Sequence, residues 1–246
     1  MFITACSDGA NAANAGVDNG SLSQGKGSDE TGSFQDGSTL VDSRDGQTYR
    51  TVTIGNQTWM AQNLNYETDN SWCGGGSEPT ETDCSIYGRL YTWAAAVGKS
   101  ESECGYRKLC NLSSGNIRGV CPQSWHLPSK KEWETLIVAV DGSITENGHS
   151  NTAGKKLKSA SGWNNHGGKS GNGTDAYSFS ALPAGYRYDS GYCDCEGYST
   201  DFWSSTEEGD GYAYNMELRF DYDGSGPGSS AKDIWFSVRC IKDYFF

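Results

Sequence analysis

Eight aromatic side chains lie between residues 186 and 214, a higher density than one buried face of a sheet requires. Flat aromatic rings stack on the apolar faces of sugars, and tyrosine and tryptophan do so with little loss of side-chain entropy. Core packing accounts for about half of these rings. The rings expected to face a ligand are Tyr188, Tyr192, Trp203 and Tyr212.

Carboxylates gather in the same part of the chain. Asp221 and Asp223 lie in the segment DYDGSG, and Glu207, Glu208 and Asp210 lie in a neighbouring loop. Calcium takes roughly six to eight oxygen ligands from loops of this kind, so these acids form a candidate calcium site. The DYDGSG segment matches only the first part of an EF-hand pattern and lacks its terminal glutamate. Solvated loop acids in an acidic protein are the alternative interpretation.

Residues suited to acid–base or nucleophilic catalysis are sparse. The sequence has three histidines, and His126 lies between Trp125 and Leu127, which favours a buried structural imidazole over a catalytic base. His149 and His166 occur in polar segments without the spacing of metal ligands. Neither HExxH nor GxSxG occurs. We therefore expect a protein that is not an enzyme and that has no cofactor unless calcium binds.

Nine cysteines in 246 residues indicate an oxidising compartment. Four disulfides are expected, although spacing alone leaves their connectivity open. The expected pairs are Cys73 with Cys84, Cys104 with Cys110, Cys121 with Cys240, and Cys193 with Cys195. A reactive thiol pair or half of a zinc site at Cys193 and Cys195 is the weaker alternative, because Arg187 is the nearest basic residue and no second ligand pair follows.

The ninth cysteine lies near the N-terminus. Residues 3–7, ITACS, resemble the bacterial lipobox, whose cysteine is lipidated once a signal segment has been removed. Residues 1–6 are therefore expected to be the end of a truncated signal with its lipidation site at Cys6. A cysteine placed there by chance is the alternative. Ser7 after the cysteine favours the outer membrane, so a cell-surface lipoprotein held to the membrane only by its lipid is expected.

The rest of the chain divides by composition. Residues 7–39 are rich in Gly, Ser, Asn and Asp and cannot bury a core, so they are expected to form a flexible tether. Residues 40–246 are expected to form one domain. The net charge of −12 argues against a nucleic-acid partner, because phosphate binding needs clustered Lys and Arg. No other segment has the roughly 18 consecutive apolar residues of a membrane span.

A helix is expected to organise the domain. Ser129 lies three residues before Glu132 and forms a capping box at the start of an apolar series. Trp133, Leu136, Ile137 and Val140 follow at the spacing of one helix face. That face requires a sheet or a second helix to cover it.

Strands are expected on both sides of this helix. Residues 48–54 and 58–61 form a hairpin around Gly55-Asn56-Gln57, and a helix toward the end of 87–97 stops at Gly98. A shorter helix is expected at 153–159. The late strands are expected at 177–182, 202–205, 212–220 and 234–241. This order predicts an α+β fold with two to three helices packed on antiparallel strands.

Six motifs occur in order along the folded part: DSRDGQTYRTVTIGNQTWMAQNLNY (42–66), YGRLYTWAAA (87–96), VCPQSWHLPSKKEWETL (120–136), FSALPAGYR (179–187), FWSSTE (202–207) and FSVRCIKD (236–243). Together they resemble the Fibrobacter succinogenes major paralogous domain over residues 41–243. Trp235 departs from the small residues usual before the last motif, so an exposed addition is expected there.

The resemblance implies a secreted or lipid-anchored surface protein of unknown biochemical role. The segment HLPSKKEWETL also resembles a helix of the formylglycine-generating enzyme family, which implies a C-type lectin-like fold with long, ligand-binding late loops. Activity does not follow from fold. The expected function is binding of an extracellular glycan. A structural or protein-interaction module of the cell envelope is the alternative, and a formylglycine-generating-type oxidase is a remote one.

Overall fold

The computed structural model describes residues 38–244 except 77 and 191, and of residues 193–195 it describes only the backbone. Cys6 and the expected tether lie outside the described residues, apart from the last two tether positions. Those positions begin the first strand, β1 (Ser38–Val41).

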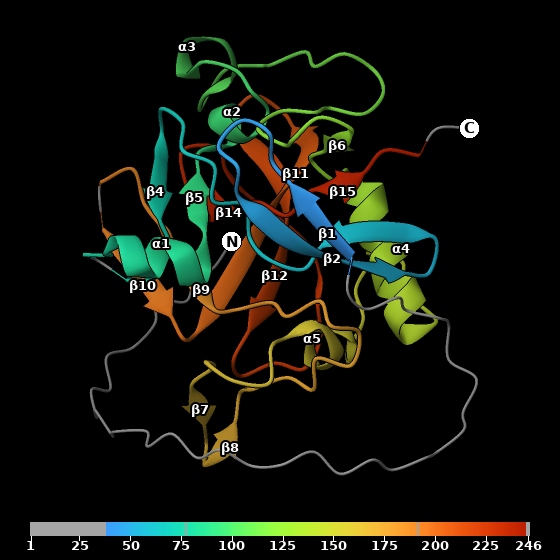
Figure 1. Ribbon diagram of the computed structural model, residues 1–246. Helices are drawn as coiled ribbons and strands as arrows, with labels where there is room; N and C mark the ends of the chain where they lie inside the picture. The colour runs from blue at the N-terminus through green and yellow to red at the C-terminus, as the bar shows by residue number, and fades with distance from the viewer. Residues whose placement is uncertain (1–37, 77, 191, 245–246) are drawn as a thin grey trace.

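One sheet joins the two ends of the described chain (Figure 1). The predicted hairpin is confirmed as β2 (Thr48–Ile54) and β3 (Gln57–Met60). Gly55 has a φ of +60°, a value that glycine adopts without strain. The C-terminal strand β15 (Ile241–Lys242) pairs with β3 on one side and with β6 (Trp125–His126) on the other, while β1 pairs with β2.

The larger sheet is curled and carries the late part of the chain (Figure 1). Its central strand is β11 (Ser199–Glu208), which forms an antiparallel hairpin with β12 (Tyr212–Arg219). The other members are β4 (Ser71–Cys73), β5 (Arg89–Tyr91), β9 (Ala184–Arg187), β10 (Cys193–Glu196), β13 (Gly226–Ala231) and β14 (Phe236–Ser237). A separate short hairpin consists of β7 (Asn165–His166) and β8 (Lys169–Ser170).

The organising helix is confirmed as α4 (Lys130–Asp141), the longest helix of the described chain. The capping box of Ser129 and Glu132 is present, and Gly142 ends the helix in the left-handed conformation. The predicted second helix is confirmed as α5 (Ala153–Leu157). The remaining helices are α1 (Glu81–Tyr87), α2 (Trp93–Ala96) and α3 (Glu101–Cys104). The α+β prediction is therefore confirmed only in part: the described chain is mostly β with a few helices, and it has five helices where two to three were expected.

Two apolar cores lie on opposite faces of β11. Phe202 packs with Trp59 and Trp133 in the core under α4, and the rings of Trp59 and Trp133 stack with centroids 4.6 Å apart. The next residue, Trp203, points the other way into the core around Trp93 and Phe236. Because successive residues of a strand face opposite sides, one strand separates the two cores.

One predicted late strand is wrong, the strand predicted at 234–241 is interrupted between β14 and β15, and one late strand was not predicted. Residues 177–182 are not a strand, because Ser178 and Ser180 have φ values of +54° and +53° and the Asp175 carboxylate accepts hydrogen bonds from Ser180. The strand begins later, as β9. Strand β13 was not expected from its sequence GPGSSA. β13 forms because β12 supplies a pairing edge. Glycine is needed at position 226 because a Cβ there would lie 2.1 Å from His149 Nδ1.

Two further predictions differ in detail. Leu90 belongs to β5, so the helix predicted within 87–97 is only the four-residue α2. The larger sheet also contains parallel contacts, from β11 to β9 and from β11 to β14. The connection from β9 to β11 contains β10, and the connection from β11 to β14 contains β12 and β13.

Three of the expected disulfides are present: Cys73–Cys84, Cys104–Cys110 and Cys121–Cys240. The first two close short loops, whereas the third joins the segment before α4 to the segment before β15 across 119 residues. The side chains of Cys193 and Cys195 lie outside what the structure describes. Within residues 38–244, apart from 77 and 191, no helix has both the length and the apolar character needed to cross a membrane.

Candidate functional site

Tyr188 and Tyr192 lie at the two ends of the turn between β9 and β10. The amide of Tyr188 donates to the carbonyl of Tyr192 over 2.8 Å. Their rings stack with centroids 6.5 Å apart and planes inclined by 23°. Tyr192 is 56% exposed and Tyr188 is half-buried. The structure therefore brings two of the predicted ligand-binding rings together; we call them the tyrosine pair.

Trp203 was also predicted to face a ligand, and this prediction is wrong. Its side chain is fully buried, its ring lies 4.5 Å from that of Phe236, and its Nε1 donates to the carbonyl of Tyr91 over 2.8 Å. Trp203 is a core residue because β11 is covered on both faces. The first two residues of FWSSTE are both apolar, and adjacent apolar residues in a strand indicate that both of its faces are buried.

Tyr212 is 39% exposed, but its ring packs edge to face on Tyr106 at 6.4 Å. Tyr106 belongs to the loop closed by the Cys104–Cys110 disulfide. The structure thus places Tyr212 against that loop and gives no ring contact between it and the tyrosine pair among the described residues.

The other side of β9 carries a tryptophan–arginine stack, formed by Trp72, Arg187 and Trp235. The guanidinium carbon of Arg187 lies 4.4 Å from the ring centroid of Trp72 and 4.8 Å from that of Trp235. Such stacks orient a guanidinium group and stabilise it. Trp72 is 40% exposed, whereas Trp235, expected to be an exposed addition, is half-buried. Arg187 Nε and Trp235 Nε1 are buried without a hydrogen-bond partner in the described chain.

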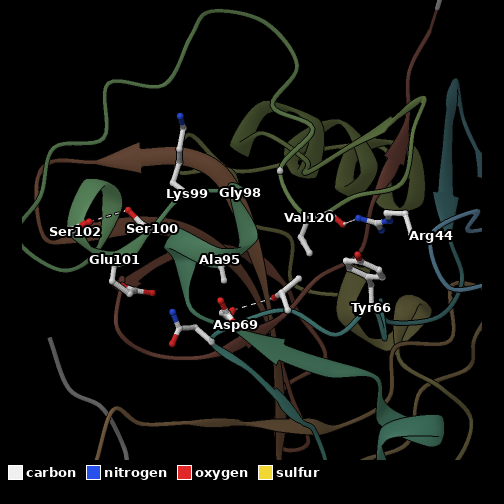
Figure 2. Close-up of a pocket in the computed structure, with 13 residues that line it drawn as sticks. Arg44, Tyr66, Asp69, Ala95, Gly98, Lys99, Ser100, Glu101, Ser102 and Val120 are labelled. Atoms are coloured by element: carbon white, nitrogen blue, oxygen red, sulfur yellow. Dashed lines mark hydrogen bonds between the residues drawn. The ribbon is translucent and has the colours of Figure 1, made fainter.

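A cleft with a volume of about 610 Å³ lies beside α2 and α3 (Figure 2). Its wall comes from segments far apart in the sequence: Arg44, residues 66–70, residues 95–102, and residues 119–120. This volume is within the range of cavities that hold a small ligand. Figure 2 shows Arg44 and Tyr66 on one side of the cleft and Ser100, Glu101 and Ser102 on the opposite side.

Arg44 is held firmly in its side of the cleft. Its guanidinium carbon lies 3.7 Å above the ring of Tyr66, its Nη1 donates to the carbonyl of Val120 over 2.9 Å, and its Nη2 pairs with Asp42 at 2.6 Å. Burial raises the pKa of Asp42, but the hydrogen bonds and charge of Arg44 outweigh this and lower it. The charge of Arg44 is therefore matched inside the protein.

Glu101 has a different environment on the opposite side. Its Oε1 accepts a hydrogen bond of 2.5 Å from the hydroxyl of Thr92. Burial raises the pKa of Glu101 despite that bond, and repulsion from Asp233 and Asp189 raises it further. Asp189 directly follows Tyr188 in the sequence.

The acids predicted to bind calcium are not brought together. Glu207, Glu208 and Asp210 lie at one end of β12, and Asp221 and Asp223 follow the other end, roughly 25 Å away for an eight-residue strand. Among the described residues, no group of three or more His, Cys, Asp or Glu side chains is placed to hold a metal ion. The five acids therefore do not form one site.

Three of these acids have other partners, among them Asp223, which pairs with Lys155 at 4.0 Å. Glu207 Oε1 accepts a hydrogen bond of 2.7 Å from the amide of Cys110 and pairs with the buried Lys232 at 2.5 Å. Asp221 pairs with Arg219 at 3.1 Å. Glu207 therefore supports the loop that follows α3, which is a structural role.

His126 is buried between two carboxylates. Its Nε2 lies 2.8 Å from Glu132 Oε1 and its Nδ1 lies 2.6 Å from Asp243 Oδ1. Both ring nitrogens are thus occupied, as expected for a structural imidazole. The network joins β6, the start of α4 and the end of β15.

Several residues of the candidate site were missed from the sequence. Glu101 lies in a short polar segment, and Trp72 lies in a glycine-rich loop region, so neither has a periodic signal. Arg187 was considered only as a neighbour of cysteines. The density of aromatic residues after position 186 was the one signal that pointed to this edge of the sheet.

The comparisons with known proteins identify a family. No curated protein and no solved structure matches the chain. A family model, described as the Fibrobacter succinogenes major domain, matches residues 52–242. These residues include nearly all of both cores, the tyrosine pair, and most of both sheets and of the cleft wall. The chain therefore belongs to the Fibrobacter succinogenes major domain family.

Proposed function

We propose that this chain is a non-catalytic domain that binds an extracellular glycan. The observation that carries the proposal is the tyrosine pair, two stacked and partly exposed rings on the turn between β9 and β10. Exposed rings supply flat apolar surface for sugar rings, and the polar cleft supplies acceptors and donors for sugar hydroxyls.

The tryptophan–arginine stack supports the same function. Trp72 exposes a large ring at an edge strand, and Arg187 is oriented between two indoles. Residues Asn70 and Trp72 lie two positions apart, so one chain segment contributes to both the cleft wall and the stack. A polymer with several sugar units would reach more than one of these features.

Two further parts of the proposal rest on the sequence. The likeness of HLPSKKEWETL supports a C-type lectin-like variant of the α+β fold, and α4 with its covering sheet is compatible with it. The lipobox-like segment at Cys6 supports display at the cell surface through a lipid anchor. Expression with a complete signal segment tests the anchor, because Cys6→Ala is expected to move the protein from the detergent phase to the aqueous phase.

Retention of the full chain on immobilised glycans and on insoluble cellulose and chitin tests glycan binding. The double variant Tyr188→Ala/Tyr192→Ala is expected to weaken binding at least about tenfold, since stacking on two rings is lost. Its free energy of unfolding is expected to change by less than about 1 kcal/mol, because the rings are partly exposed. The matched control is Tyr222→Ala, which removes a ring that is 45% exposed beyond the end of β12.

The outcomes separate the candidate functions. Binding that survives in the double variant contradicts the tyrosine pair as the site. A large loss of stability in that variant shows that the rings are structural. Failure of the wild-type chain to bind any glycan contradicts the proposal and favours the alternative, a structural or protein-interaction module of the envelope.

A further inference from the structure

The tryptophan–arginine stack is assembled across the curl of the larger sheet. Arg187 in β9 and Trp235, directly before β14, form an antiparallel bridge: the amide of Trp235 donates to the carbonyl of Arg187 over 2.8 Å, and the reverse hydrogen bond is 3.2 Å long. Trp72 comes from β4, the strand at the far edge of the sheet. The amide of Gly75, just after β4, donates to the carbonyl of Ala184 in β9 over 3.2 Å, so β4 and β9 lie on the same side of the molecule (Figure 1). Backbone contacts therefore preorganise the stack.

Arg187 has no partner for its charge within residues 38–244 as the structure describes them. It takes part in none of the ion pairs and donates no side-chain hydrogen bond. Other arginines have a carboxylate or carbonyl partner: Arg44, Arg50, Arg89, Arg118, Arg219 and Arg239. Arg107 is also unpaired, but it is exposed. In a chain with a net charge of −12, a partly buried guanidinium group without an internal anion can attract one from outside.

The end of the Arg187 side chain is the part that a ligand can reach. The guanidinium carbon lies 4.4 Å from the ring centroid of Trp72 and 4.8 Å from that of Trp235, so both indoles contact the group. Its Nε is buried, whereas Nη1 and Nη2 are neither buried nor hydrogen-bonded in the described part of the chain. Terminal guanidinium nitrogens form a fork of donors that matches the two oxygens of a carboxylate. The stack therefore presents a carboxylate-binding group to solvent.

An exposed indole adjoins these donors. Trp72 is 40% exposed and offers flat apolar surface on which a sugar ring can stack. In a uronic acid the carboxylate is attached directly to the sugar ring, so one sugar unit can contact both Arg187 and Trp72. Asp189 and Asp233 each lie two residues from a member of the stack, and neither forms an ion pair with Arg187. Their repulsion disfavours an anion that does not contact the guanidinium group directly.

We propose that the tryptophan–arginine stack binds the carboxylate of a uronic acid unit in a glycan. Nη1 and Nη2 of Arg187 donate to the two carboxylate oxygens, and the sugar ring lies on Trp72. This inference rests on the proposed glycan-binding function and names its ligand class. A methyl ester of the same glycan has no charge at that position and loses the attraction of Arg187.

Calorimetric titration of the full chain with defined oligosaccharides tests the proposal. The probes are hexamers of galacturonate, mannuronate and guluronate, each as the free acid and as the methyl ester, and hexaglutamate as a carboxylate polymer without sugar. At about pH 7, where the carboxylates are ionised, at least one free acid is expected to bind about tenfold more tightly than its ester. This preference is expected to shrink as salt rises from about 0.05 M to about 0.5 M, because salt screens the charges. Hexaglutamate is expected to bind more weakly, because it has no ring to stack on Trp72.

Variants of the stack locate the effect. Arg187→Gln is expected to abolish the preference for the free acid and to leave binding of the ester unchanged. Arg187→Lys keeps a positive charge without the fork of donors, so it is expected to keep part of the preference, and it serves as the test if Arg187→Gln does not fold. Trp72→Ala is expected to weaken binding of the acid and of the ester to a similar extent, because stacking is lost. The matched control is Arg107→Gln, which removes the other unpaired arginine and is expected to change neither.

The results distinguish this inference from the function on which it rests. Equal binding of each acid and its ester overturns the carboxylate site and leaves glycan binding intact. A preference for the acid that survives in both Arg187 variants overturns the stack as its location. Hexaglutamate binding as tight as that of the uronates overturns the sugar in favour of an acidic peptide. Retention on cellulose or chitin without binding of any uronate overturns this inference alone, whereas absence of both overturns the glycan-binding function as well.

Discussion

Nε2 of His126 lies 2.8 Å from Oε1 of Glu132, which connects β6 to the first turn of α4. Burial lowers the pKa of His126, but the hydrogen bonds and charges of Glu132 and Asp243 outweigh it and raise the pKa above 6.5. Burial raises the pKa of Glu132, but hydrogen bonds with His126 and Ser129 lower it below 4.5. The pair is therefore ionised in the folded protein between these values.

The pair makes stability depend on pH. A raised histidine pKa contributes stability at pH values below the pKa of the unfolded state, and this stability is lost as the pH rises through the pKa of the folded state. A lowered glutamate pKa contributes stability at pH values above the pKa of the unfolded state, and this stability is lost as the pH falls through the pKa of the folded state. The contribution is therefore largest between about pH 4.5 and 6.5.

His126→Gln is expected to lower the free energy of unfolding by about 3 kcal/mol at about pH 5.5 and by less at about pH 9. Urea unfolding at both pH values measures the difference. His166→Gln is the control, because His166 is exposed. A loss of equal size at both pH values would contradict an ionic contribution.

Among the buried cations, Arg239 is the one whose substitution is expected to destabilise the fold most. Its guanidinium is fully buried, donates to Asn63 Oδ1 and to the carbonyls of Phe179 and Ser180, and lies 4.4 Å from the ring of Phe179. Burial lowers its pKa to about 9. Arg239→Met leaves two carbonyls and an amide oxygen unpaired, so a loss of about 3–5 kcal/mol is expected in urea unfolding. Exposed Arg107→Met, measured alongside, should change stability by less than about 1 kcal/mol.

The Cys121–Cys240 disulfide is expected to contribute more than the Cys104–Cys110 disulfide. The Cys121–Cys240 disulfide closes a loop of 119 residues, whereas the Cys104–Cys110 disulfide closes a loop of 6. The entropy that a disulfide removes from the unfolded chain grows with the logarithm of this loop length. Double Ser variants should lose about 4–5 kcal/mol for the long closure and about 2 kcal/mol for the short one. Thermal unfolding of each variant measures this, and peptide mapping under non-reducing conditions checks the pairing. A larger loss from the short loop would contradict the order.

Calcium removal is expected to leave the melting temperature unchanged, because the five acids are divided between the two ends of β12. Glu207→Gln is nevertheless expected to lower it, since the buried Lys232 loses its anionic partner. Melting with and without a chelator, in the wild type and in this variant, checks both statements. Glu208→Gln, at an exposed position, is the matched control. A chelator-dependent shift in the wild type would restore the calcium hypothesis.

Local signals in the sequence predicted the elements whose stabilising contacts are local. The capping box at Ser129 and the apolar spacing after it predicted α4, and the β-branched residues around Gly55 predicted the β2–β3 hairpin. Segment 177–182 resembled a strand in composition, but Arg239 and Asp175 hold its backbone in another conformation. Arg239 is distant in the sequence and Asp175 lies in the preceding turn, so the periodicity of the segment itself could not predict either contact.

The sequence by itself determined the helix, the first hairpin, the presence of both helices and strands, and the family likeness, because capping, alternation and ordered motifs are properties of neighbouring residues. Only the tertiary structure decided which aromatic residues are exposed. Trp203 and Tyr192 look alike in a sequence, yet Trp203 is buried because β11 lies between two cores, and Tyr192 is exposed because it lies at a turn. Only the tertiary structure, too, placed Glu101 opposite Arg44. A cleft whose wall comes from four distant segments exists only once their packing has brought them together.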